Sequence, residues 1–179
     1  MEIRLAKTAG FCFGVDRAVQ LTGRLLDAGE KVATLGPLIH NPQVVAGLER
    51  RGACVAAGPA QVPPGYKVVI RSHGVPQSVY DQLAALGLAW EDATCPFVAK
   101  IHAIARRADE EGACLAVAGD AAHPEVQGIV GHTRGESFVF ANLEELKAWN
   151  GPENPKKRMF VVAQTTFQAT KWQECSEFL

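Results

Sequence analysis

The stretch Lys67-Val68-Val69-Ile70-Arg71-Ser72-His73-Gly74-Val75-Pro76 decides the fold class, because a short apolar run passes here into a polar turn that ends in proline. Downstream, Val79, Leu83 and Leu86 recur at the i, i+4 and i+7 positions of one helix face. The stretch therefore predicts a buried strand, a loop and an amphipathic helix in that order. This is the repeating unit of parallel-sheet α/β proteins.

The same order recurs along the rest of the chain. Apolar runs followed by polar turns lie at residues 32–35, 114–118, 138–140 and 159–163. Asn142 and Glu145 have the spacing of a capping box at the start of one of the helices that follow. Parallel strands joined through helices require right-handed crossovers. The sequence thus predicts tandem small parallel-sheet α/β units, with a seam near Cys95 that separates a first unit, 13–95, from a second, 96–179.

Composition restricts the classes of function. The 179 residues are 47% hydrophobic, enough to bury a core, and carry a formal net charge of −1. This balance gives no general field that would attract nucleic acid. The sequence has no apolar run long enough to span a bilayer, and Met1 to Lys7 lacks a signal-peptide core. We therefore expect a cytoplasmic protein that contacts neither nucleic acid nor membrane.

Three of the five histidines share one structural position. His40, His73 and His123 each follow an apolar run and precede a proline by two, three and one residues. Ligands of open parallel sheets bind outside the carboxyl ends of strands, and helix N-termini there favour anions. The three imidazoles therefore predict a phosphate or diphosphate site, the alternative being histidines tolerated in polar turns. His102 reads as a partly buried or surface helix residue, and His132 as a loop residue with nothing to recruit it.

Two further polar positions are candidates for chemistry at this edge. Glu125 follows His123 by two residues and is the best-placed carboxylate for proton transfer, although a first-turn glutamate can also simply complement the helix dipole. Thr165 and Thr166 follow an apolar strand, where their hydroxyls either face the same edge or cap the last helix.

Cysteine usage indicates a metal or redox centre. Cys12, in Gly10-Phe11-Cys12-Phe13-Gly14, and Cys95, in Thr94-Cys95-Pro96, each stand at a turn before a predicted helix. A thiolate there meets the positive end of the helix dipole. Five cysteines without a Cys-x-x-Cys pair favour free thiols or metal ligands over disulfides. Cys54, Cys114 and Cys175 read as structural.

Six motifs in register resemble those of the 4-hydroxy-3-methylbut-2-enyl diphosphate reductase family, which closes the methylerythritol phosphate route to isoprenoids. They are Gly10-Phe11-Cys12-Phe13-Gly14-Val15, Gly36-Pro37-Leu38-Ile39-His40-Asn41, Arg71-Ser72-His73-Gly74, Asp92-Ala93-Thr94-Cys95-Pro96, His123-Pro124-Glu125 and Gln164-Thr165-Thr166. The resemblance implies three similar α/β units around a [4Fe–4S] cluster held by three cysteines.

The resemblance also implies roles for individual residues. Cys12 and Cys95 match two cluster ligands, and His40, His73 and His123 match the residues that bind the diphosphate. Glu125 would deliver protons, with His123 beside it, and Thr165 would hydrogen-bond near the allylic oxygen. Electrons would come from a ferredoxin or flavodoxin, and the products would be isopentenyl and dimethylallyl diphosphate.

The sequence departs from the family pattern after Gln164-Thr165-Thr166. The third cysteine ligand and a Ser-x-Asn motif that also binds the diphosphate are expected in a third unit, and neither is present up to Leu179. Residues 1–12, with a strand at Ile3 to Ala6, would belong with that absent unit. We therefore expect a truncated form that holds a cluster poorly and has little activity alone.

Two other functions remain open from the residues. One is a diphosphate-binding module that uses the three histidines without redox chemistry. The other is a thiol oxidoreductase in which Cys12 and Cys95 form a redox pair, which requires their sulfur atoms to come within disulfide reach.

Overall fold

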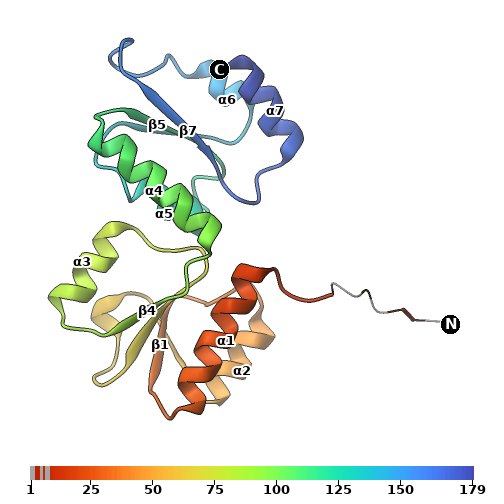
Figure 1. The fold of residues 1–179 in the computed structure, drawn as a ribbon, viewed down its shortest axis with the longest axis vertical. Coiled ribbons are helices and arrows are strands. Elements are labelled where there is room, and N and C mark those ends of the chain that lie inside the picture. Colours follow the sequence, from red (N-terminus) through yellow and green to blue (C-terminus); the bar gives the residue numbers. More distant parts are fainter. Residues whose placement is uncertain (1–2, 5, 7–8) are drawn as a thin grey trace.

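The structure, a computed structural model, describes residues 3–4, 6 and 9–179. It contains two small α/β units that lie end to end along the long axis of the molecule, each built on its own parallel sheet (Figure 1). The predicted fold class, tandem parallel-sheet α/β units, is confirmed. The expected N-terminal strand, Ile3 to Ala6, includes Leu5, which lies outside the described residues.

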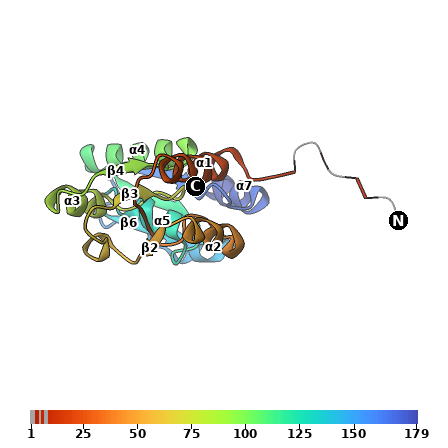
Figure 2. The same ribbon diagram turned by 90° about the horizontal axis from the view of Figure 1, so that it is seen from below.

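The first unit is a four-stranded parallel sheet in the order β2-β1-β3-β4. Helices α1 and α2 cover one of its faces, whereas α3 lies on the other (Figures 1 and 2). Its elements are α1 (Phe13–Asp27), β1 (Val32–Leu35), α2 (Pro42–Arg50), β2 (Cys54–Ala56), the 3-10 turn η1 (Pro59–Gln61), β3 (Lys67–Ile70), α3 (Gln77–Ala85) and β4 (Trp90–Asp92).

The second unit is a three-stranded parallel sheet in the order β6-β5-β7. Helices α4 and α5 pack on one face, and α6 and α7 pack on the other. Its elements are α4 (Pro96–Glu110), β5 (Cys114–Ala118), α5 (Pro124–Val130), β6 (Ser137–Phe140), α6 (Leu143–Ala148), β7 (Met159–Ala163) and α7 (Ala169–Phe178).

The central strands supply the cores because both of their faces are covered. All five residues of β5 are buried, and β3 sends Val69 towards α1 while Val68 and Ile70 face α3. Leu83 is fully buried on α3, as its place in the helical pattern predicts. Leu86 does not belong to that face: α3 ends at Ala85, and Leu86 is 53% exposed at its C-cap.

Local hydrogen bonds fix the helix starts that the sequence indicated. The Glu145 backbone N–H donates to Asn142 Oδ1 at 2.9 Å, and Glu145 Oε2 accepts from the N–H of Ala141 at 2.8 Å. This reciprocal pair is the capping box of α6, shifted by one residue on the return bond. Neither Thr165 nor Thr166 caps α7, since the N-cap of that helix is Gln168.

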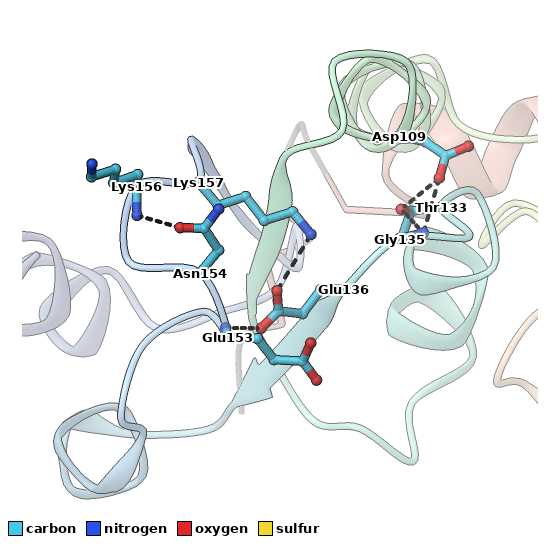
Figure 3. Close-up of polar contacts among 8 residues, drawn as sticks. All are labelled: Asp109, Thr133, Gly135, Glu136, Glu153, Asn154, Lys156 and Lys157. Carbon is cyan, nitrogen blue, oxygen red and sulfur yellow. Dashed lines mark hydrogen bonds and ion pairs between the residues drawn. The ribbon is translucent and has the colours of Figure 1, made fainter.

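Carboxylates anchor two connecting loops of the second unit (Figure 3). Asp109, at the end of α4, accepts hydrogen bonds from the N–H groups of Arg134 and Gly135 and from Thr133 Oγ1, at 2.7, 2.9 and 3.3 Å. These backbone donors lower the pKa of the Asp109 carboxyl. Glu136 binds the next loop through the Glu153 N–H and Lys157 Nζ. The loop that carries His132 is therefore anchored to α4.

Among the described residues, no helix is both long and apolar enough to cross a bilayer.

Candidate functional site

In each sheet, the second strand in sequence lies on one side of the first strand and the third strand lies on its other side. This order places two pairs of loops at the point where the sheet changes direction. In the first sheet β1 and β3 are neighbours, but their crossovers lead to opposite sides, to β2 and β4. In the second sheet the same reversal lies between β5 and β7. The crevice at such a switch point is where open α/β sheets bind ligands. The loops after β1, β3, β5 and β7 carry His40, His73, His123 and Thr165, respectively.

The three predicted histidines meet where the two units adjoin. Ring centroids are 4.8 Å apart for His40 and His73, 5.4 Å for His73 and His123, and 5.9 Å for His40 and His123. One ring nitrogen from each lies within 4.8 Å of those of the other two. His40 is exposed, whereas His73 and His123 are partly buried. Residues separated by 83 positions in sequence thus form one cluster that solvent can reach.

His73 is held neutral at the centre of this cluster. Burial, followed by the positive charges that His40, Arg71 and His123 can carry, lowers the pKa of His73 to about 4. Its Nδ1 atom is buried and has no hydrogen-bond partner among the described residues. A neutral imidazole presents one N–H donor and one acceptor. The His73 ring is therefore a directed hydrogen-bonding group at neutral pH, and a ligand is the natural partner of its free nitrogen.

Arg71 supplies the permanent cation at this place, a role that the sequence motif alone did not indicate. Its guanidinium lies against Gly36, where a Cβ atom would stand 2.9 Å from Nη1, and its buried Nε has no hydrogen-bond partner within the described part of the chain. Gly36 has a φ of +72° and leaves the room that the guanidinium fills. Burial lowers the pKa of Arg71. The signal for its role was its position directly after the buried strand β3.

His123, Glu125 and Thr165 form a connected set at the second switch point. His123 is the N-cap of α5, and its Nδ1 accepts the Glu125 backbone N–H at 3.1 Å. A neutral His123 consequently carries its proton on Nε2. The Glu125 carboxylate, 2% exposed, accepts from the Thr165 N–H at 2.6 Å and from Thr165 Oγ1 at 2.8 Å. The carboxylate of Glu125 is therefore buried and held in place by the loop after β7.

Gln164 connects the same two loops, a role that its sequence motif did not indicate. Its Oε1 accepts the Asp120 N–H at 3.2 Å, and its Nε2 donates to Thr166 Oγ1 at 2.7 Å. The side chain is nearly buried against Gly119, where any Cβ would approach it to 3.0 Å. Gln164 thereby fixes the loop after β5 to the loop after β7.

Cys12 and Cys95 lie at the starts of two helices that converge beside the cluster. Each is the N-cap of its helix, α1 and α4, and neither side chain makes a capping hydrogen bond. A Cβ atom on Gly14 would stand only 2.6 Å from Cys95 Sγ, so the first turn of α1 directly contacts this thiol. Both cysteines are free. Two thiols at helix N-termini, where a thiolate is stabilised, fit a thiolate-bound metal centre.

Hydrogen bonds attach the segment around Cys95 to helix α1 and to the loop after β3. Arg17 of α1 donates to the carbonyl oxygens of Thr94 and Asp92 at 3.0 and 3.1 Å. The Cys95 N–H donates to the carbonyl of Ser72, the residue before His73, at 2.9 Å. The thiol is therefore positioned by the same loop that carries one of the clustered histidines.

Gly14→Ala is expected to lower the free energy of unfolding by about 1–3 kcal/mol, because the added methyl overlaps Cys95 in a packed contact. Gly23→Ala in the same helix is the matched control: its methyl would meet only the flexible Arg51 guanidinium, at 3.4 Å. Urea denaturation of both variants measures the difference. Equal stability of the two variants would contradict the close approach of α1 to Cys95.

The remaining histidines correct two interpretations of the sequence. His102 is buried, at 3% exposed, and is not a surface residue. His132, at 6% exposed, is recruited by its neighbours: its ring lies 4.2 Å from that of His102, and its Nδ1 is 3.4 Å from Arg106 Nη1. Of the cysteines expected to be structural, Cys114 and Cys175 are buried in the core, while Cys54 is partly exposed on β2.

The fold and the site define a parallel-sheet α/β protein in which histidines, a buried carboxylate and two thiols meet at the carboxyl edges of two sheets. The family model described as "LytB protein" matches residues 3–179. The chain belongs to this family.

Similar proteins share one name. A 4-hydroxy-3-methylbut-2-enyl diphosphate reductase of Oleidesulfovibrio alaskensis is 43% identical over 167 residues, which cover 93% of this chain and 59% of that protein. A reductase of the same name from Solidesulfovibrio magneticus is 37% identical over 185 residues, covering 100% of this chain and 64% of that protein. The chain thus spans about three-fifths of the length of the curated relatives it matches.

Solved structures agree with the fold. A structure of (E)-4-hydroxy-3-methyl-but-2-enyl diphosphate reductase superimposes with a TM-score of 0.83 at 38% identity, covering 98% of this chain and 62% of the other. The E-1-hydroxy-2-methyl-but-2-enyl-4-diphosphate reductase of Plasmodium falciparum gives a TM-score of 0.87 at 26% identity, covering 96% of this chain and 54% of the other.

Proposed function

We propose that this chain is part of an enzyme that reductively removes the hydroxyl group of 4-hydroxy-3-methylbut-2-enyl diphosphate. The net reaction consumes two electrons and two protons, breaks the allylic C–O bond, and releases water with isopentenyl and dimethylallyl diphosphate. The observation that carries the proposal is the meeting of His40, His73 and His123 from three strand ends next to the Glu125–Thr165 pair.

The histidine cluster is the proposed diphosphate site. Three imidazoles converge on one place, and His73, neutral in the free protein, can donate a ring N–H to a phosphate oxygen. The positive charge comes from Arg71 beside it. Binding energy from the diphosphate would hold the reacting carbon in place without taking part in the chemistry.

Cys12 and Cys95 would hold an iron–sulfur cluster, and their free thiols at two helix starts fit that group. Such a cluster supplies electrons singly and offers a Lewis-acidic iron to the hydroxyl oxygen. A ferredoxin or flavodoxin is the proposed electron donor. The described residues place two cysteines here, whereas three are expected, so we infer that residues 1–179 alone hold a cluster weakly and turn over slowly.

Glu125 and Thr165 are the proposed proton path. Glu125 is buried, and both of its carboxylate oxygens accept hydrogen bonds from Thr165. The Thr165 hydroxyl also has lone pairs available to a substrate oxygen. A proton on Glu125 can therefore pass through the Thr165 hydroxyl to the departing group, while His123, bonded to the Glu125 backbone, stays fixed beside them.

Substrate binding tests the proposal on the chain itself. We expect His40→Ala to weaken the affinity for 4-hydroxy-3-methylbut-2-enyl diphosphate about tenfold, the cost of one charge-assisted hydrogen bond. His40 is exposed, so its removal leaves the fold intact. Gln43→Ala, an exposed residue in the first turn of α2, is the control and should bind normally. Calorimetry measures both, and wild-type affinity in His40→Ala would contradict the diphosphate site.

A diphosphate-binding module without redox chemistry is the second candidate, because the histidine cluster needs no cysteine. Anaerobic reconstitution with iron and sulfide separates the two functions. In a full-length reductase that carries residues 1–179 of this chain, the reductase function predicts an absorption band at about 410 nm that Cys12→Ser or Cys95→Ser removes. Cys54→Ser, at a partly exposed thiol on β2, is the control and should retain the band. A band that survives in the Cys12→Ser and Cys95→Ser variants would overturn the assignment of the ligands.

A further inference from the structure

One buried ring fills the contact between the two units. His102, on α4, presents Cε1 and Nδ1 to Gly74 and presents Nε2 and Cε1 to Gly128. A Cβ atom on Gly74 would stand 2.4 Å from Cε1, and one on Gly128 would stand 3.2 Å from Nε2. Two glycines in different units therefore make room for the same imidazole. The Nε2 atom is buried and has no hydrogen-bond partner among the described residues, so the fit is one of shape.

Other side chains of the second unit also enclose the His102 ring. His132 packs on it with ring centroids 4.2 Å apart, and Arg106 reaches His132 Nδ1 at 3.4 Å. His132 belongs to the loop that Asp109 anchors to α4. His102 consequently has little space to retreat if either glycine gains a side chain, since packed interiors transmit such displacements.

The two glycines belong to the elements that carry the proposed site. Gly74 directly follows His73, and Gly128 lies on α5, which begins after His123 and bears Glu125. A Cβ atom on Gly128 would stand 3.5 Å from the His73 carbonyl oxygen. Close by, the Gln77 N–H donates to the Gly131 carbonyl at 3.1 Å, and Gly131 lies against Pro76. The loop after β3 and helix α5 thus touch along one seam.

We propose that His102 is a positioning residue: its ring sets the separation between the His73 loop and α5, and so sets the spacing of His73 from His123 and Glu125. No part of the His102 side chain is assigned to a ligand. Its effect on diphosphate binding rests on the proposed function, whereas its effect on the surroundings of His73 does not.

The test uses the 179-residue chain and four variants. His102→Ala removes the spacer, and His102→Leu keeps an apolar group of similar bulk. Gly128→Ala pushes the His102 ring. The double variant, His102→Ala with Gly128→Ala, places the new methyl in the space that the ring vacated. Gly47→Ala is the control, because its methyl would meet nothing closer than Arg50 Nη2 at 3.9 Å. Affinity for inorganic pyrophosphate is measured by calorimetry, and the titration of His73 is followed by NMR of its imidazole nitrogens. Thermal unfolding verifies that each variant is folded.

We expect Gly128→Ala to weaken pyrophosphate binding about tenfold on its own but less than about twofold when added to His102→Ala, because the two groups interact through shared space. His102→Leu should remain within about threefold of the parent affinity. In His102→Ala and Gly128→Ala, the titration of His73 should move, since His123 and Arg71 are among the charges that set it.

Two results would overturn the positioning role. One is a folded His102→Ala protein in which both pyrophosphate affinity and the His73 titration match the parent. The other is an effect of Gly128→Ala that is the same with and without the His102 ring. A parent protein that does not bind pyrophosphate would count against the proposed function alone, because the NMR titration still reads the spacing.

Discussion

Glu125→Gln is expected to lower the rate of reductive dehydroxylation by about 10²- to 10⁴-fold, the range that a positioned acid–base group contributes. The amide has nearly the shape of the carboxyl group. It can accept the Thr165 N–H, which the carboxylate accepts at 2.6 Å, and hydrogen-bond with the Thr165 hydroxyl. It has no acidic proton to give. The variant therefore removes proton delivery while it preserves the hydrogen-bonded loop contact.

The measurement requires a full-length reductase that carries residues 1–179 of this chain, assayed with a chemical one-electron donor so that donor docking does not limit the rate. Glu144→Gln is the matched control, because Glu144 is an exposed carboxylate in the first turn of another helix of the same unit. Substrate affinity should be unchanged in both variants. Full turnover in Glu125→Gln would remove the proton-delivery role from this residue.

The local patterns of the sequence were sufficient to predict how the site loops are built. Apolar runs such as Val68–Ile70 form strands, and the proline after each of His40, His73 and His123 marks the start of the following helix region. Parallel strands of one sheet bring their carboxyl ends to one edge, so His40 and His73 meet there, and His123 joins them from the second sheet. The meeting of His40 with His73 follows from patterns that a few adjacent residues encode, whereas the approach of His123 depends on how the two units pack together.

Contacts between the units were beyond such local patterns. His102 lies on an ordinary amphipathic helix, and its burial depends on Gly74 and Gly128, which are distant in sequence. The burial of His132 likewise depends on residues distant in sequence, Arg106 and His102. The strands β2 and β4 are only three residues long, too short to give a periodic signal, and β4 also mixes a tryptophan with two carboxylates. Leu86 fits the helical period of the sequence, but helix α3 ends one residue earlier, at Ala85.

The buried histidines lead to the second prediction: the free energy of unfolding is expected to fall steeply as the pH is lowered from about 6.5 towards 5. Burial lowers the pKa of His102 to about 3 and that of His132 to about 4, and nearby positive charge from Arg106 adds to the effect on both. His132 also lowers the pKa of His102, whereas Asp92 acts in the opposite direction on both rings.

The sign follows from proton counting. The unfolded chain binds a proton on each of these histidines below the ordinary histidine pKa of about 6.5, whereas the folded protein does not until the pH approaches the lowered values. Between these limits the unfolded state binds more protons, so stability is full above about pH 6.5 and decreases with falling pH. With His73, whose pKa is also lowered to about 4, three such groups give a slope of at most about 4 kcal/mol per pH unit. Aspartate and glutamate carboxyls remain mostly ionised down to about pH 5 and contribute little in this window.

Urea denaturation at pH 7.0, 6.0 and 5.0 measures this slope, and calorimetry in buffers with different ionisation enthalpies counts the protons taken up on unfolding. His132→Gln should reduce the uptake at pH 5 by about one proton, because a glutamine at this position cannot be protonated. The exposed control Gln168→Ala should leave the uptake unchanged, since Gln168 makes no capping hydrogen bond in α7 and carries no titratable group. Stability that stays constant from pH 7 to pH 5 would mean that His102 and His132 are not kept neutral by the fold, and the packing of the two rings at the contact between the units would then be wrong.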